Sequence, residues 1–133
     1  MKAFLFSYGG NNDRGEVIHL GDTYNVNFPK ENEACYGVAF RRDVDIEFED
    51  NAQELTIEFE SKLPFKATLE FKTEKSGGAP EESFVLNAKE GFNSHTFPMP
   101  ELNSRLKEIC FCIFKNENLN LETEISILSF NVK

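Results

Sequence analysis

Few residues in this sequence have the types and the spacing that catalysis or metal binding requires. The two histidines, His19 and His95, have no metal-ligand spacing to each other or to a cysteine. The sequence has no Gly-x-Ser-x-Gly nucleophile motif, no glycine-rich phosphate loop and no Cys-x-x-Cys pair. Carboxylates are abundant, but in a chain with a net charge of −9 any single pair of them is expected by chance. We therefore predict that the protein is not an enzyme.

The cysteines are expected to be free thiols. Three cysteines cannot all pair within one chain. Cys110 and Cys112 are two residues apart in a predicted strand, so both side chains point to one face and cannot bridge easily. Buried free thiols suit a reducing cytosol or an anaerobic habitat.

Calcium is the one ion that the sequence leaves open. Asp13, Glu16 and Asp22 lie around the first predicted loops and carry the carboxylate oxygens that calcium prefers. There is no EF-hand loop or other diagnostic spacing. We predict no cofactor and no metal ligands, with a structural calcium ion as the alternative.

Ligand binding through exposed rings and polar side chains is the remaining chemistry. The chain has 14 Phe and no Trp, and because Phe has no polar group most of its rings are expected in the core. The amphipathic rings are those of three tyrosines. The ring and polar residues that we expect to stand clear of the core and to bind a ligand are Tyr8, Asn25, Tyr36, Arg41 and His95.

Charge and length narrow the class of protein. The excess of acids disfavours nucleic acid and membrane partners, because both offer anionic surfaces that need a basic face. No apolar run approaches the roughly 18 residues of a membrane span, and the apolar start of the chain is too short for a signal peptide. A chain of 133 residues predicts a single domain, over residues 1–133.

Alternating apolar and polar residues predict the elements that position these side chains. Segments 44–48, 55–59 and 65–71 have an apolar residue at every second position, with charged residues and Thr between them. Segment 24–28 repeats this alternation, with Asn25 and Asn27 between its apolar residues. The other predicted strands are apolar on both faces or carry weaker signals, and they cover residues 2–7, 16–20, 34–41, 83–87, 93–97, 109–114 and 124–132. Only 101–107 has a helical pattern, of one or two turns.

Many short strands separated by turn residues predict an all-β protein, a jelly-roll-type β-sandwich of two antiparallel sheets. The in-register apolar residues form the predicted core, which comprises Phe4, Phe6, Val44, Ile46, Phe48, Leu55, Ile57, Phe59, Leu69, Phe71, Phe111, Ile113, Ile125, Ile127, Leu128 and Phe130.

The short predicted loops favour hairpins between consecutive strands. Pairing of 55–59 with 65–71 would set Glu60 opposite Lys66 and Glu54 opposite Lys72, which are favourable cross-strand pairs.

Pairing of 44–48 with 55–59 would instead form an acidic hairpin. It would set Asp45 opposite Glu58 and Glu49 opposite Glu54, and like charges directly opposite are destabilising. We expect solvation and salt to offset this repulsion. A neighbouring basic strand or a bound divalent cation are the alternatives.

The C-terminal third carries a resemblance to a known family. Met99-Pro100-Glu101-Leu102 leads through Leu106 into the apolar run 109–114, and a loop separates that run from the final segment 124–132. This pattern resembles the end of the β-jelly-roll carbohydrate-binding modules appended to polysaccharide-degrading enzymes, in which the last strand pairs with the first. The resemblance implies a non-catalytic module that binds a plant or microbial polysaccharide or oligosaccharide on a concave sheet face or at the loop tips.

The same resemblance implies that the module targets an attached enzyme, a parent glycoside hydrolase in a longer chain. The absence of Trp favours a single soluble glycan chain over a flat crystalline ligand. The alternative function is a β-sandwich protein-interaction or structural assembly domain without a small-molecule ligand. We expect an extracellular location if the chain is a module of a secreted enzyme, and a cytoplasmic location if Met1 is the natural start.

Overall fold

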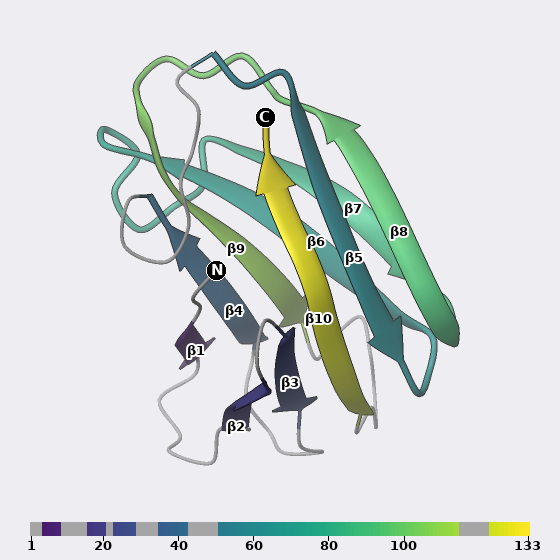
Figure 1. Ribbon diagram of the computed structural model, residues 1–133. Helices are drawn as coiled ribbons and strands as arrows, with labels where there is room; N and C mark the ends of the chain where they lie inside the picture. The colour runs from purple at the N-terminus through teal and green to yellow at the C-terminus, as the bar shows by residue number, and fades with distance from the viewer. Residues whose placement is uncertain (1–3, 9–15, 21–22, 29–34, 43–50, 115–122) are drawn as a thin grey trace.

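The described part of the protein forms two five-stranded antiparallel β-sheets packed face to face (Figure 1). A computed structural model describes residues 4–8, 16–20, 23–28, 35–42, 51–114 and 123–133. We name each sheet for its central strand. The β9 sheet contains, in spatial order, β1 (Phe4–Tyr8), β4 (Cys35–Arg41), β9 (Leu106–Phe114), β6 (Phe65–Thr73) and β7 (Glu82–Ala88). The β10 sheet contains β2 (Glu16–Leu20), β3 (Thr23–Phe28), β10 (Thr123–Val132), β5 (Glu54–Ser61) and β8 (Gly91–Pro98).

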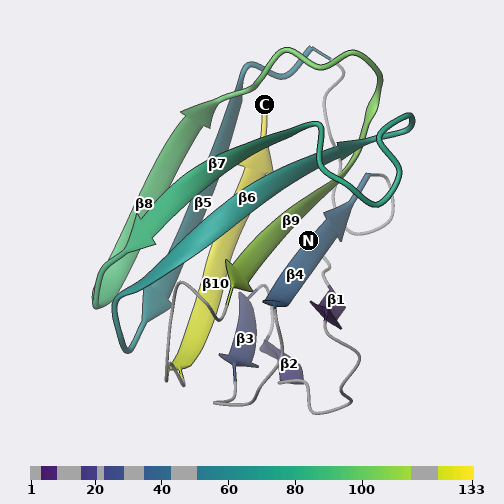
Figure 2. The same ribbon diagram turned by 180° about the vertical axis from the view of Figure 1, so that it is seen from behind.

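The two sheets form the two layers of a sandwich. Figure 1 views the β10 sheet from outside, with β6, β7 and β9 crossing behind it, and Figure 2 shows the β9 sheet from the opposite side. This is the all-β sandwich that the alternation predicts, and each predicted strand within the described residues is present. The predicted strand 44–48 lies outside them. The described residues contain no helix, so no helix among them could cross a membrane.

Aromatic side chains fill the space between the sheets. Phe40 of β4 stacks on Phe130 of β10, with ring centroids 3.9 Å apart. The ring of Phe59 from β5 meets that of Phe111 from β9 edge to face at 5.6 Å. Most of the predicted core is confirmed, because the residues with at most 5% exposure include Leu55, Ile57, Phe59, Leu69, Phe71, Phe111, Ile113, Ile125, Ile127 and Phe130.

The remaining predicted core residues fall into two groups. Leu128 is only half-buried, so its assignment to the core is wrong. The pairing of β10 with β5 shifts register between Ile127 and Ser129, and this β-bulge takes Leu128 out of the inward alternation. Val44, Ile46 and Phe48, and the side chains of Phe4 and Phe6, lie outside the described part of the chain.

The predicted hairpins are wrong, because β5 has different neighbours. β5 pairs with β10 along one edge and with β8 along the other, so it has no edge for 44–48 or for 65–71. β6 belongs to the opposite sheet, between β7 and β9. Glu58 consequently lies opposite Ser129 and Ser94, and not opposite another acid.

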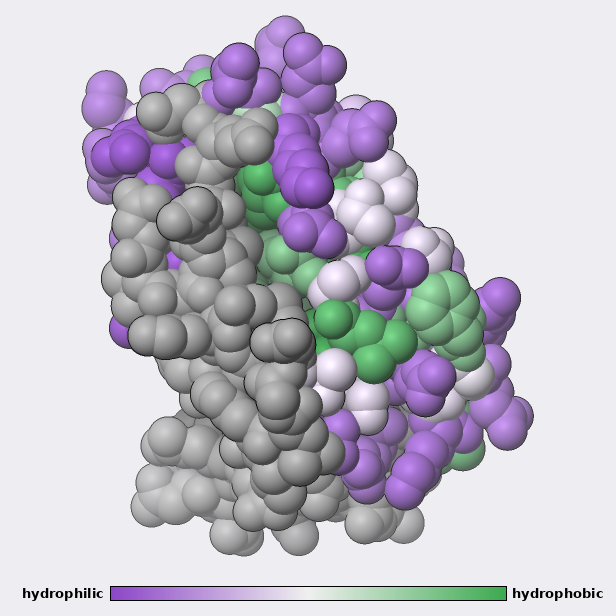
Figure 3. Space-filling view, viewed as in Figure 1, coloured by the Kyte–Doolittle hydropathy of each residue, from purple (hydrophilic) through white to green (hydrophobic). Residues whose placement is uncertain are grey.

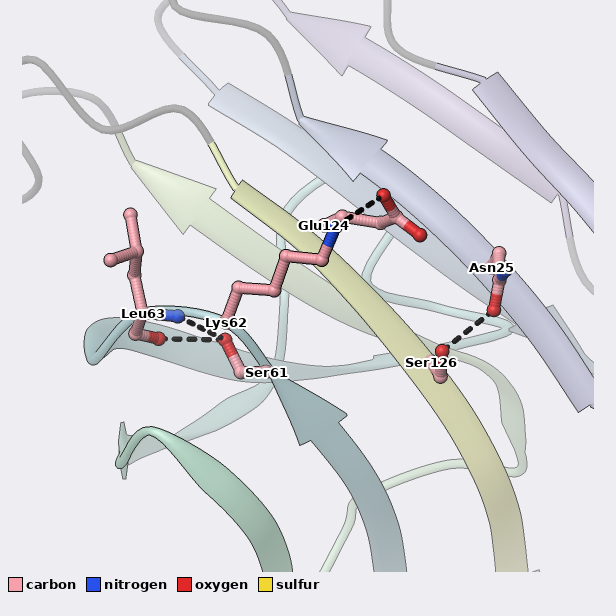
Figure 4. Close-up of polar contacts among 6 residues, drawn as sticks. All are labelled: Asn25, Ser61, Lys62, Leu63, Glu124 and Ser126. Atoms are coloured by element: carbon pink, nitrogen blue, oxygen red, sulfur yellow. Dashed lines mark hydrogen bonds and ion pairs between the residues drawn. The ribbon is translucent and has the colours of Figure 1, made fainter.

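The turn at residues 61–64 explains why β5 and β6 separate. The Ser61 hydroxyl donates to the Leu63 carbonyl at 2.6 Å and accepts from the Leu63 amide at 3.3 Å (Figure 4). This compact turn is a corner that carries the chain from one sheet to the other.

Two further expectations are also corrected. Residues 101–107 are not helical: the Asn103 amide donates to the carboxylate of Glu81, and the Ser104 hydroxyl accepts from the Lys75 amide, so the segment bonds to a distant loop. β9 already begins at Leu106. The last strand does not pair with the first, because β10 lies between β3 and β5 while β1 pairs with β4.

Candidate ligand-binding face

Polar side chains cover most of the outward side of the β10 sheet, where they lie side by side on neighbouring strands. In β5 the buried residues Leu55, Ile57, Phe59 and Ser61 alternate with residues that point away from the core. The same alternation applies to β8 and, on either side of its bulge, to β10, and Asn25 of β3 lies opposite the outward Ser126. We call the resulting surface the polar face, and its described members are Asn25, Glu54, Thr56, Glu58, Glu60, Phe92, Ser94, Thr96, Glu124, Ser126, Ser129 and Asn131.

Strand register places one residue from each of four strands in a line across this face. Ser126 of β10 lies opposite Asn25 of β3 and also opposite Glu60 of β5. Glu60 in turn lies opposite Phe92 of β8. The three gaps between these strands span about 14 Å at the usual separation of about 4.8 Å per pair. The line therefore offers a ring, a carboxylate, a hydroxyl and an amide along an extended path.

Two hydrogen bonds fix the polar groups of this region. The Ser126 hydroxyl donates to Asn25 Oδ1 at 2.6 Å (Figure 4). One row further along, the Ser129 hydroxyl donates to Glu58 Oε1 at 2.9 Å. Each carboxylate or amide oxygen has a second lone pair, so both groups can accept a further hydrogen bond from a ligand hydroxyl.

Two apolar side chains stand among these polar groups. Phe92 is 49% exposed, which is unusual for a large hydrophobic residue in this chain. Leu128 is half-buried at the bulge of β10, next to Ser129. Figure 3 shows the described part of this face as mostly hydrophilic, with hydrophobic residues in its middle. An exposed ring with acceptors and hydroxyls around it can take a ligand that has both apolar and hydroxyl surfaces.

The described part of the face is acidic. It carries the carboxylates of Glu54, Glu58, Glu60 and Glu124. A cation reaches it from the turn after β5, where Lys62 Nζ contacts Glu124 Oε2 at 3.2 Å (Figure 4). This electrostatic balance disfavours an anionic ligand.

The predicted site residues do not form one surface. Asn25 lies on the polar face, on β3. Arg41 is exposed at the end of β4, opposite Glu108 of β9, and therefore belongs to the other sheet. The backbones of Tyr8 and Tyr36 lie in β1 and β4 of that same sheet, while their side chains are outside the described set. Of the predicted residues, the structure places only Asn25 in the line described above.

His95 points inward from β8, towards the open edge of the sandwich. Its ring stacks on Phe59 at 5.8 Å and on Phe97 at 6.4 Å, and Nε2 contacts Asn93 Oδ1 at 3.2 Å. Burial lowers the pKa of His95, and the positive charge of Lys89 lowers it further. The imidazole is therefore neutral at pH 7 and packs as an aromatic ring.

Sequence reasoning missed Phe92 because it assigned phenylalanine rings to the core. The signal that could have found it is parity. Phe92 and Phe97 are five positions apart, so in one regular strand they must point to opposite faces. One of the two rings had to be directed outward. The bulge that exposes Leu128 has the same kind of signal, because the apolar positions Ile125 and Ile127 are odd-numbered while Phe130 and Val132 are even-numbered, which a regular strand cannot direct to one face.

The described residues do not gather into a metal-binding group. None of their histidines, cysteines and acids form a cluster of three that could hold an ion. The calcium prediction stays a prediction, since Asp13, Asp22 and the side chain of Glu16 lie outside the described set.

Cys110 and Cys112 are buried free thiols, as predicted. Their Sγ atoms lie near Glu108 at 3.1 Å and Glu70 at 3.5 Å.

Comparison with known proteins gives matches of fold. Neither a family model nor a curated protein matches this sequence. Among solved structures, PfGH50B matches with a TM-score of 0.71 and 11% identity over 99% of this chain, which spans 23% of that protein. The family 11 carbohydrate-binding module from Clostridium thermocellum, solved with a β-1,3-1,4-mixed-linked tetrasaccharide, matches at 0.66 and 8% identity, covering 98% of this chain and 87% of the module.

A further match is to TmCBM61 in complex with β-1,4-galactotriose, with a TM-score of 0.61 and 12% identity over 98% of this chain and 87% of that one. At these identities the likeness is one of fold. The chain therefore has the β-sandwich fold of carbohydrate-binding modules, as the resemblance of its C-terminal third implied.

Proposed function

We propose that this chain is a non-catalytic carbohydrate-binding module that binds a neutral polysaccharide chain on the polar face. The observation that carries the proposal is the line of Asn25, Ser126, Glu60 and Phe92 across four strands of the β10 sheet. Sugars have apolar C–H faces that pack on rings, and their hydroxyls both donate and accept hydrogen bonds. The line supplies partners for both kinds of surface.

The charges of the face support a neutral glycan. The line contains the carboxylate of Glu60, and three further carboxylates and one exposed lysine lie around it. A uronate or sulfate chain would meet repulsion there, while a neutral sugar can donate its hydroxyl protons to Glu58 and Glu60.

The solved structures supply suitable probes. The family 11 module was solved with a β-1,3-1,4-mixed-linked tetrasaccharide, TmCBM61 with β-1,4-galactotriose, and a mutant of a family 29 module with mannohexaose. All three are neutral and differ in the sugar and the linkage, so together they sample the specificity of the polar face.

A role in targeting an attached enzyme is part of the proposal. The match to PfGH50B covers nearly all of this chain but under a quarter of that protein, so a domain of this fold and size occurs inside a longer chain. The lack of catalytic motifs in the sequence is consistent with a binding role. A glycoside hydrolase in the same reading frame would support the targeting role, and a gene that encodes no enzyme would contradict it.

The test is binding to soluble polysaccharides, measured by affinity gel electrophoresis and by calorimetry with the three oligosaccharides. We expect saturable binding to at least one neutral glycan. We also expect Phe92→Ala to weaken it on the order of tenfold, as removal of a central aromatic contact does.

The matched control is Val85→Ala. Val85 is 53% exposed and lies on the outer side of the β9 sheet, opposite Thr68, so this variant removes a similar exposed apolar side chain from the other surface. Equal loss in both variants would contradict the assignment of the site to the polar face. Absence of binding to any neutral glycan would contradict the function itself and would favour the protein-interaction alternative.

A further inference from the structure

A pocket lies at the opposite end of the β10 strand from Ser126. A pocket of about 230 Å³ opens where the chain passes from β8 to β9 and where β10 ends at Val132. Its location is the end of the sandwich at which the C-terminus lies (Figure 1). Six residues of an extended strand separate Val132 from Ser126, or about 20 Å, so this pocket is distinct from the line on the polar face.

Part of the pocket wall is apolar, and backbone hydrogen bonds join the segments around it. Met99 and Leu102 pack against the main core, and Val132 is buried. The Met99 amide donates to the Gln53 carbonyl at 2.8 Å, and the Glu54 amide donates to the Lys133 carbonyl at 2.8 Å. These bonds connect the start of β5 to the segment after β8 and to the residue after β10, and so fix the backbone next to the pocket.

Two arginines and a serine supply the polar side of the pocket. Arg42 Nε donates to the Leu106 carbonyl at 2.6 Å, which orients its guanidinium at the wall. Arg105 and Ser104 come from the segment before β9, and Arg105 is exposed. Both arginines make other contacts as well. A guanidinium has five N–H donors, so each can add a ligand oxygen to the partners it already has.

The two arginines among the described lining residues favour an anionic ligand. Among the described residues that line the pocket there are two guanidinium groups and no Asp or Glu. Guanidinium groups bind planar carboxylates through paired hydrogen bonds. This is the reverse of the polar face, where carboxylates predominate. A volume of about 230 Å³ lies below the range of roughly 300–1,000 Å³ for drug-sized ligands. The ligand is therefore no larger than about one sugar ring.

We infer that this pocket binds the carboxylate of a small ligand, with the guanidinium groups of Arg42 and Arg105 on the carboxylate oxygens and the apolar wall against the ligand body. A uronic acid residue and a short aliphatic carboxylate share this chemistry. The inference is independent of the proposed function, because it involves different residues and an anionic ligand, whereas the polar face is proposed to bind a neutral glycan.

The test is an NMR titration of the ¹⁵N-labelled full chain with four probes: glucuronate, galacturonate, isovalerate and neutral glucose. We expect saturable shifts at the amides of Leu102, Ser104, Leu106 and Val132 with at least one carboxylate, and none with glucose. Saturation by a uronate identifies an acidic sugar as the ligand class, and saturation by isovalerate alone identifies an aliphatic acid. The Asn25 and Ser126 amides should not shift.

Charge-matched variants separate the site from general anion binding. Arg105→Gln removes a pocket guanidinium on an exposed side chain and should weaken the carboxylate about tenfold, as loss of a charged hydrogen bond does. Arg41→Gln removes an equally exposed neighbouring charge that does not line the pocket, and it should bind as the parent chain does. No shift with any carboxylate, or equal weakening in both variants, would overturn the inference.

Discussion

At the scale of single residues, the surroundings of a side chain decide its role more than its type does. His95 was chosen as a ligand-binding residue because histidine is polar, yet its ring lies in a stack with Phe59 and Phe97. Phe92 is not among the predicted ligand-binding residues, because most phenylalanine rings are expected in the core, yet it is half exposed. Residue type alone could not distinguish these cases, since the face of a strand on which a residue lies sets its environment.

The stacked position of His95 predicts a pH dependence of stability. Burial and Lys89 lower its folded-state pKa below the unfolded value of about 6.5. Between the two pKa values the unfolded chain binds more protons, so stability rises with pH there. We therefore expect the free energy of unfolding to fall as pH drops below about 6.5, until it levels off for this group below the folded pKa.

The check is urea unfolding of the parent chain and of His95→Phe at several pH values between 7.5 and about 5, a range chosen to cover the histidine titration. The free energy of unfolding of His95→Phe minus that of the parent chain should increase as the pH falls, because only the parent has an imidazole to protonate. A difference that does not change with pH would show that the ring is not desolvated in the folded state.

At the scale of elements, alternation predicts strands well and predicts their partners poorly. The residues of β5 and β6 have the expected inward and outward sides. Their pairing was wrong because hydrophobic alternation says which face is buried but not which strand lies alongside. The Ser61 corner, which sends β6 to the other sheet, depends on hydrogen bonds of one hydroxyl that no periodicity reveals.

The β-bulge of β10 predicts unequal costs for two adjacent substitutions. Ile127 is fully buried, so Ile127→Ala should lower the free energy of unfolding by about 2–5 kcal/mol. Leu128 is half-buried outside the inward alternation, so Leu128→Ala should cost less than about 1.5 kcal/mol. Chemical denaturation of both variants measures this, and equal costs would show that the bulge is misplaced.

At the scale of the whole molecule, the two sheets share one core in which phenylalanine rings from both sheets meet. Phe59 and Phe111 come from different sheets and meet in the middle of that core. Truncation of either to Ala should therefore cost on the order of 3–5 kcal/mol, measured by denaturant unfolding. A loss below about 1 kcal/mol would contradict the packing of the two sheets.

The net charge of −9 acts on the molecule as a whole. The described acids of β5 face serine, proline and phenylalanine across the strands, which removes the direct pairs that a hairpin with 44–48 would have produced. The remaining repulsion is distributed, so sodium chloride should raise the melting temperature modestly by screening. Calcium should add little beyond its ionic strength, and a rise of several degrees specific to calcium would point instead to a bound ion.

The central claim is that the polar face of the β10 sheet binds a neutral glycan. The most direct measurement is an NMR titration of the labelled chain with whichever of the three neutral oligosaccharides binds most tightly in calorimetry. Saturable shifts should cluster at Asn25, Glu60, Phe92 and Ser126, in a line across β3, β10, β5 and β8. Shifts confined to the β9 sheet, or no shifts with any of the three, would contradict the account.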